Sequence, residues 1–143
     1  MNTQQMDLIE SSFNALSGQA HAIVARFYEL LFSEHPELRS IFPADLTEQR
    51  KHLVGAIGLV VKNVRDLEKI EPGLEEMGAR HVGYGAKPEH YGVVASTLIA
   101  SLKEFAGDLW TPEIEHAWSQ ALNAVATVML HGAERAGTSR KAA

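Results

Sequence analysis

The sequence of 143 residues contains no cysteine, which excludes disulfide bridges, thiolate zinc sites, iron–sulfur clusters and cysteine nucleophiles. Any metal bound by this chain must therefore take nitrogen or oxygen ligands from it. Basic residues are also few, because 13 Lys and Arg stand against 18 Asp and Glu, giving a formal net charge of −5. They are scattered apart from a final SRKAA segment, so the concentrated basic face that nucleic acid requires is missing. We expect no nucleic-acid partner.

Long hydrophobic runs are absent as well, so no segment is predicted to span a membrane. The first residues, MNTQQMDLIESSF, lack the basic start and apolar block of a secretory signal, and we expect a cytoplasmic protein. The length and a hydrophobic content of 45% fit a single domain with a sizeable core. We place that domain at residues 1–137 and expect residues 138–143 to form a flexible tail.

Apolar side chains recur at helical spacings of three and four, and no alternation of period two is sustained, which predicts an all-α fold. Thr3 and Thr111 are expected as helix caps, and Pro88 as a first helical residue. The expected helices cover about residues 3–16, 19–33, 45–65, 72–81, 88–107 and 111–132, with a short turn of helix at 38–42. A sequential four-helix bundle has no place for so many helices, so we expect them to cross one another in an orthogonal arrangement.

One of the seven histidines, His81, differs from the others. It extends the apolar line of Leu74 and Met77, and Gly83 and Gly85 follow it as a helix exit. A neutral imidazole aimed inward requires either a hydrogen bond or a metal. Without cysteine or a second histidine nearby, a zinc site of clustered ligands is disfavoured. A single axial histidine is what haem iron needs, because the porphyrin supplies four nitrogens.

Side chains elsewhere in the chain could form the opposite wall of such a site. Gln49 and Leu53 are four residues apart and project from one helical face. Tyr28 can bring a phenol into the same space, and Phe42 offers a flat ring to a flat cofactor.

Several stretches, in their order and spacing, resemble a bacterial single-domain globin related to the globin domain of flavohaemoglobins. They are FYELLF (27–32), PELRSIF (36–42), LTEQRKHL (46–53), MGARHVGYGAKPEHY (77–91) and AW (117–118). The similarity runs from about residue 5 to residue 131. It implies a globin fold of six to seven main helices around a pocket for haem b, iron protoporphyrin IX.

The resemblance also assigns roles to residues. It implies that His81 is the proximal iron ligand and that Phe42 wedges the haem. On the distal side it places Tyr28 and Gln49 as ligand-binding residues, with Leu53 packed over the iron. The remaining cofactor-binding positions are a proximal-side tyrosine, Tyr91, and the apolar residues Met77 and Val94, and the resemblance also places Phe32 in the apolar wall of the pocket.

The final helix departs from the flavohaemoglobin pattern, in which a glutamate bonds the proximal histidine and makes it a stronger donor. Counting from Trp118, that position is Ala133, with Glu134 next to it, and the usual tyrosine is Leu122. Successive residues of a helix point about 100° apart, so Glu134 is expected to point away from the position that reaches the histidine. Without this glutamate the histidine is not made a stronger donor, and strong peroxidase-type chemistry is not expected.

The resemblance favours a protein that reversibly binds O2 or another diatomic ligand at five-coordinate ferrous haem, with no catalytic residue assigned. His52 is expected to face outward and leave the sixth coordination position open. One alternative is an enzyme, a nitric oxide dioxygenase served by a separate reductase, since no Gly-rich nucleotide-binding loop is recognisable here. Another is a gas sensor that signals through partner contacts.

Overall fold

The computed structural model describes the backbone of residues 1–142 and the side chains of residues 1–136. Its six α-helices are α1 (Thr3–Leu16), α2 (Ala20–Glu34), α3 (Thr47–Lys62), α4 (Glu71–Gly83), α5 (Pro88–Ala106) and α6 (Pro112–Ala142). Short 3₁₀ helices lie at Ser17–Gln19, Pro36–Ile41, Leu67–Ile70 and Gly107–Leu109. No strand occurs in residues 1–142, and the all-α prediction is confirmed.

The helix starts follow local hydrogen-bonding chemistry. Thr111 caps α6 as predicted, because its hydroxyl accepts a hydrogen bond from the Ile114 N–H at 3.2 Å. The prediction of Thr3 as the cap of α1 is wrong, since Asn2 has that role. The Asn2 side chain accepts from the Gln5 N–H at 2.8 Å, and the Gln5 side chain accepts from the Asn2 N–H at 3.0 Å. This reciprocal pair satisfies two backbone donors that the helix leaves open.

Two helix ends lie further along the chain than the spacing predicted. Helix α4 continues past His81 to Gly83, and the turn towards Pro88 follows at Gly85, whose φ is +89°. Helix α6 runs to Ala142, whereas the sequence predicted it to fade between Gly132 and Gly137. The predicted tail, residues 138–143, has its side chains outside the described part of the chain, and residue 143 lies outside it entirely. The flexibility of this tail therefore stays a prediction.

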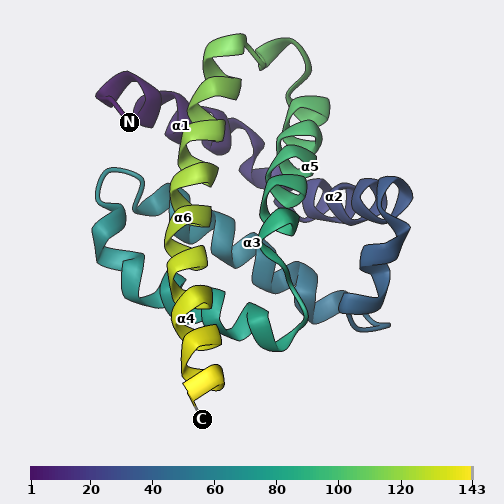
Figure 1. The fold of residues 1–143 in the computed structure, drawn as a ribbon. Coiled ribbons are helices and arrows are strands. Elements are labelled where there is room, and N and C mark those ends of the chain that lie inside the picture. The colour runs from purple at the N-terminus through teal and green to yellow at the C-terminus, as the bar shows by residue number, and fades with distance from the viewer. Residues whose placement is uncertain (143) are drawn as a thin grey trace.

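The helices cross at large angles around one core and do not form a sequential bundle. In Figure 1, α6 runs down the front, α4 crosses behind its lower half, and α5 and α2 lie to the right. The most extensive helix contacts are α4 with α6, α2 with α5, and α1 with α6. Trp118 of α6 is 1% exposed at the centre, and its indole N–H donates to the Ser12 hydroxyl of α1 at 3.0 Å.

Helices α3 and α4 do not pack closely on one another in the part of the chain that the structure describes. Helix α3 packs on α2 and α1, whereas α4 packs on α6 and on the 3₁₀ helix before it. The faces of α3 and α4 that carry Leu53 and Met77 are therefore only partly buried.

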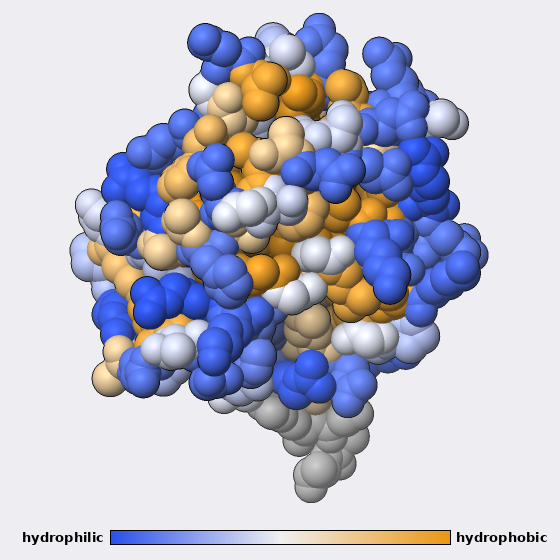
Figure 2. All heavy atoms as spheres, turned by 180° about the vertical axis from the view of Figure 1, so that it is seen from behind, coloured by the Kyte–Doolittle hydropathy of each residue, from blue (hydrophilic) through white to orange (hydrophobic). Residues whose placement is uncertain are grey.

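The surface seen from behind is apolar in its middle. Figure 2 shows hydrophobic side chains gathered in a band across that face, with hydrophilic side chains around its margin. None of the helices described here is long and apolar enough to cross a bilayer.

Candidate functional site

His81 lies two residues before the end of α4, and its ring is oriented by the helix itself. Its Nδ1 is 2.6 Å from the carbonyl oxygen of Met77, one turn earlier. A carbonyl oxygen only accepts hydrogen bonds, so in the neutral ring Nδ1 carries the proton and Nε2 has the lone pair. Metal-binding histidines commonly use the second ring nitrogen in this way, which fixes both the tautomer and the direction of the ring.

The helix end beyond His81 is closed by hydrogen bonds to its own backbone. The His81 carbonyl accepts from the N–H groups of Tyr84 and Ala86, both at 3.1 Å. The Tyr84 ring meets the His81 ring edge-on, with centroids 5.5 Å apart, although Tyr84 is 58% exposed. Tyr84 is not among the predicted site residues, because its only signal in the sequence is an aromatic residue within the glycine-rich exit from the helix.

Tyr28 of α2 is the most deeply buried of the predicted polar site residues, with 4% of its surface exposed. Its ring packs edge-on against Phe42 with centroids 5.7 Å apart and lies 5.8 Å from the ring of Phe32. Burial raises the pKa of the phenol, while a hydrogen bond with Gln49 and the charge of Arg50 act in the opposite direction. The structure thus brings Tyr28, Gln49 and Phe42 together from three separate segments.

The first turns of α3 supply the next side chains. Gln49 and Leu53 are both half-buried one turn apart, and Leu53 packs against the core cluster that contains Tyr28. His52 is exposed, in agreement with the predicted outward orientation. Helix α3 begins after Asp45, whose carboxylate accepts hydrogen bonds from the Thr47 hydroxyl at 2.7 Å and the Thr47 N–H at 2.9 Å. These bonds hold the pKa of Asp45 below its usual value.

Phe42 lies at an extended corner that a single arginine secures. The Arg39 guanidinium donates to the carbonyl oxygens of Phe42, Pro43 and Ala44 at 3.3, 2.9 and 2.9 Å. It also lies over the Phe32 ring at 5.1 Å. Arg39 was not predicted, because its role depends on a chain reversal that spacing alone does not reveal.

We expect Arg39→Met to loosen this corner, because several carbonyl oxygens lose a charged donor and each such bond contributes about 1.5–3 kcal/mol at most. The free energy of unfolding should fall by about 1–3 kcal/mol in chemical denaturation. Arg26→Met is the matched control, since Arg26 forms only surface ion pairs with Glu29 and Glu104. Surface pairs contribute about 0–1 kcal/mol. Equal losses in the two variants would contradict the role given to Arg39.

Helix α5 brings Tyr91 and Val94, both half-buried, and Val94 packs on the same core cluster. Burial raises the pKa of Tyr91 as well as that of Tyr28. On α6, Leu122 and Ala133 are half-buried and Glu134 is exposed. The distance of 2.6 Å from Nδ1 makes the Met77 carbonyl, on the same helix, the acceptor for the His81 Nδ1–H.

The raised pKa of Tyr28 gives a direct optical test. A free tyrosine ionises near pH 10, and burial delays this ionisation in the folded protein. In an alkaline titration followed by tyrosinate absorbance, we expect Tyr28→Phe to remove a late component and leave the early part of the curve unchanged. Loss of an early component instead would show that the phenol is open to solvent. Since the folded-state pKa lies above the unfolded one, this group lowers stability only as the pH rises past about 10.

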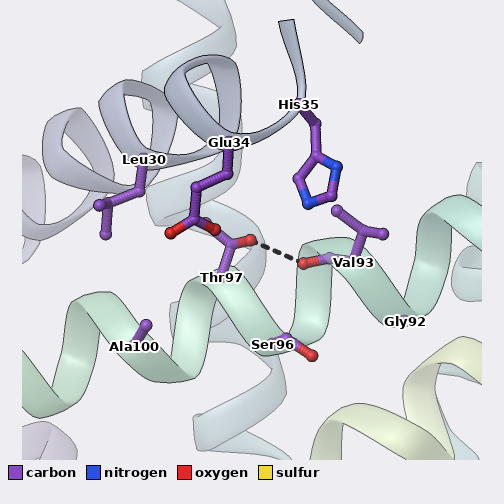
Figure 3. Close-up of a pocket in the computed structure, with 8 residues that line it drawn as sticks. All are labelled: Leu30, Glu34, His35, Gly92, Val93, Ser96, Thr97 and Ala100. Carbon is purple, nitrogen blue, oxygen red and sulfur yellow. Dashed lines mark hydrogen bonds between the residues drawn. The ribbon is translucent and has the colours of Figure 1, made fainter. Parts of the chain in front are cut away.

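A cleft of about 370 Å³ lies apart from these residues, between the end of α2 and α5 (Figure 3). Its lining is formed by Leu30, Glu34, His35, Gly92, Val93, Ser96, Thr97 and Ala100. The Thr97 hydroxyl in its floor donates to the Val93 carbonyl at 2.8 Å. None of the predicted site residues lines this cleft, so it is distinct from the candidate site.

The sequence from residue 25 to residue 129 matches the globin family. The chain belongs to the globin family. This match covers most of the chain and confirms the predicted globin fold. The resemblance to the globin domains of flavohaemoglobins is confirmed by this match and by the related proteins described next.

Among curated proteins, this globin is 32% identical over 135 residues to the flavohemoprotein of Bacillus subtilis (strain 168), a match covering 91% of this chain and 33% of that one. The chain thus spans about a third of the length of the curated relatives it matches. A structure of an engineered carbene transferase, derived from a proposed nitric oxide dioxygenase of Rhodothermus marinus, has a TM-score of 0.90 at 24% identity, covering 99% of both chains. The flavohemoglobin of Malassezia yamatoensis with bound FAD and heme has a TM-score of 0.80 at 18% identity, covering 94% of this chain and 37% of that one. At these identities the two structures establish the fold.

Proposed function

We propose that this globin binds haem b through His81 and reversibly binds O2 or another diatomic ligand on the opposite side. The observation that carries the proposal is the 2.6 Å contact between His81 Nδ1 and the Met77 carbonyl, which leaves Nε2 as a preoriented donor. Haem-containing flavohemoglobin among the fold neighbours supports the same cofactor. Because the chain has no cysteine for thioether bonds, the haem is held without covalent attachment to its vinyl groups.

The residues present suit a haem. One imidazole is offered as a donor, and no cluster of three or more His, Asp or Glu side chains that could hold a free metal ion occurs in the described residues. The flanking side chains Phe42, Leu53, Met77 and Val94 are apolar and only half-buried, which suits the face of a porphyrin. Among the described side chains no buried polar atom lacks a hydrogen-bond partner.

When bound, ferrous haem supplies the iron coordination position that accepts the diatomic ligand. The phenol of Tyr28 and the amide of Gln49 can both donate hydrogen bonds to the negative end of such a ligand. Burial keeps the phenol protonated and strengthens its bond by excluding water. Two neutral hydrogen bonds of about 0.5–1.5 kcal/mol each would slow ligand release by roughly tenfold to a hundredfold.

The test is the visible spectrum of ferrous protein with and without CO, followed by stopped-flow measurement of O2 release. We expect a five-coordinate ferrous spectrum that shifts on CO addition, with slow O2 release. A six-coordinate ferrous spectrum that disappears in His52→Ala would contradict the open sixth position.

A second candidate function is the oxidation of nitric oxide to nitrate, which the names of the flavohemoprotein and dioxygenase relatives favour. One NO, one O2 and one electron give one nitrate ion, so turnover requires a reductase as partner. Steady NO consumption by the oxygenated protein in the presence of a flavin reductase and NADH would establish this activity. A single stoichiometric burst that is not renewed would restrict the protein to ligand binding.

A further inference from the structure

Helices α4 and α6 meet through their backbones, at a pair of glycines. A Cβ atom on Gly78 of α4 would lie 1.9 Å from the carbonyl oxygen of Met129 on α6. A Cβ atom on Gly132 of α6 would lie 1.9 Å from the carbonyl oxygen of Glu75 on α4. Real Cβ atoms essentially never come closer than 3.0 Å to other heavy atoms, so neither position tolerates even alanine without a shift of one helix.

The two contacts are reciprocal. On α4 the residues involved are Glu75 and Gly78, and on α6 they are Met129 and Gly132, so that on each helix they lie three residues, or about one turn, apart. Each helix therefore presents a glycine to the backbone of the other, and the separation of the helices is set by backbone atoms, with no flexible side chain between them. This crossing is the most extensive helix contact in the fold. Arg135 and Glu75 form an ion pair beside it.

Glycine inside a helix is unfavourable by about 1 kcal/mol relative to alanine, so two glycines at one crossing need a compensating reason. Close packing of the two helices is one such reason. The position of Gly78 along α4 supplies a second reason, because Met77 precedes it and His81 follows three residues later. The Met77 carbonyl orients the His81 ring, so the peptide that accepts from Nδ1 is next to the residue in contact with α6.

We propose that Gly78 and Gly132 are positioning residues for His81, and that their contact fixes the distance and tilt at which the imidazole meets the haem iron. The crossing acts through the covalent link between the imidazole and α4. Any side chain at either glycine moves α4 relative to α6 and carries the imidazole with it. This inference rests on the proposed haem-binding function.

The experiment compares Gly78→Ala and Gly132→Ala with wild-type protein by resonance Raman spectroscopy of the ferrous, ligand-free state. We expect both variants to shift the iron–imidazole stretching band in the same direction. We also expect haem transfer to a high-affinity acceptor to accelerate by about 10- to 100-fold, as for the loss of other groups that orient a metal ligand.

Gly73→Ala is the matched control. Gly73 lies on the same helix, and a Cβ added there meets no atom within 4 Å. Its iron–imidazole band should remain at the wild-type position. An unshifted band in Gly78→Ala, or the same shift in Gly73→Ala, would overturn the proposal.

A second comparison separates positioning from general loosening of the fold. In a His81→Gly background supplied with free imidazole, the iron ligand is no longer attached to α4. Adding Gly78→Ala to that background should leave the iron–imidazole band unchanged. A shift of the band in this double variant would contradict the proposal that the crossing acts through the covalent link between the imidazole and α4.

Two further outcomes complete the test. Should either alanine variant give no folded haem complex even when refolded with hemin in sucrose, the crossing would serve the whole fold and the proposal would be rejected. Failure of wild-type protein to bind hemin would instead refute the proposed function, whereas normal hemin binding with an unchanged band in Gly78→Ala refutes the positioning role alone.

Discussion

Replacing His81 with glycine will weaken haem binding by at least about 100-fold and remove the iron–imidazole stretching band from the ferrous spectrum. Groups that only orient a metal ligand typically contribute 10- to 100-fold to affinity, and loss of the ligand itself costs more. The contact of Nδ1 with the Met77 carbonyl identifies Nε2 as the donor that is lost. Hemin titration of the apoprotein and resonance Raman spectroscopy measure the two effects.

Arg80→Gly controls for the cost of a new glycine in α4, about 1 kcal/mol. Arg80 precedes His81 and is exposed, with a single surface pair to Glu76 at 3.4 Å. This control should retain the wild-type hemin affinity and band. Free imidazole should restore an axial nitrogen in His81→Gly. If His81→Gly behaved like Arg80→Gly, another group would have to be the proximal ligand.

Replacing Tyr28 with phenylalanine will accelerate O2 release about threefold to tenfold, because one hydrogen bond to the bound ligand is removed. The substitution keeps the ring that packs against Phe42 and Phe32, so the fold is preserved. Stopped-flow replacement of O2 by CO measures the dissociation rate. CO release should change little, because bound CO carries less negative charge than bound O2.

Gln49→Leu, alone and combined with Tyr28→Phe, completes a double-mutant cycle. Because Gln49 lowers the pKa of the Tyr28 phenol and both side chains act on the same bound ligand, their effects on O2 release should not be additive. Phe32→Leu is a suitable control, since it alters the same aromatic cluster and removes no hydrogen-bond donor. An O2 dissociation rate that Tyr28→Phe leaves unchanged would contradict the distal role of the phenol.

Much of the fold followed from local patterns in the sequence. The apolar spacing of α2 and α5 and the signals at Pro88 and Thr111 gave helices with nearly the observed starts. The error at Asn2 arose because Asn and Thr are both good caps and stand side by side. The local signal that distinguishes them is Gln5, which lies three residues after Asn2 and closes the reciprocal pair of hydrogen bonds with it.

Contacts between distant segments were less predictable. His81 stood out because an imidazole extended an apolar helical line, and the structure supplied the Met77 carbonyl that orients it. Gly132 was interpreted as a fading helix end, yet it lies within α6 against the backbone of α4. Nothing in the spacing of Gly78 and Gly132 indicates that they meet, because residues 54 apart come together only when α4 and α6 cross.

Titration of the purified apoprotein with hemin, followed at the Soret band and after reduction, tests most directly whether haem binds through His81. Haem binding through His81 predicts a sharp end point at one haem per chain, a five-coordinate ferrous spectrum, and an iron–imidazole band that is lost in His81→Gly. A titration with no end point, or a saturable complex whose spectrum is the same in His81→Gly, would contradict it.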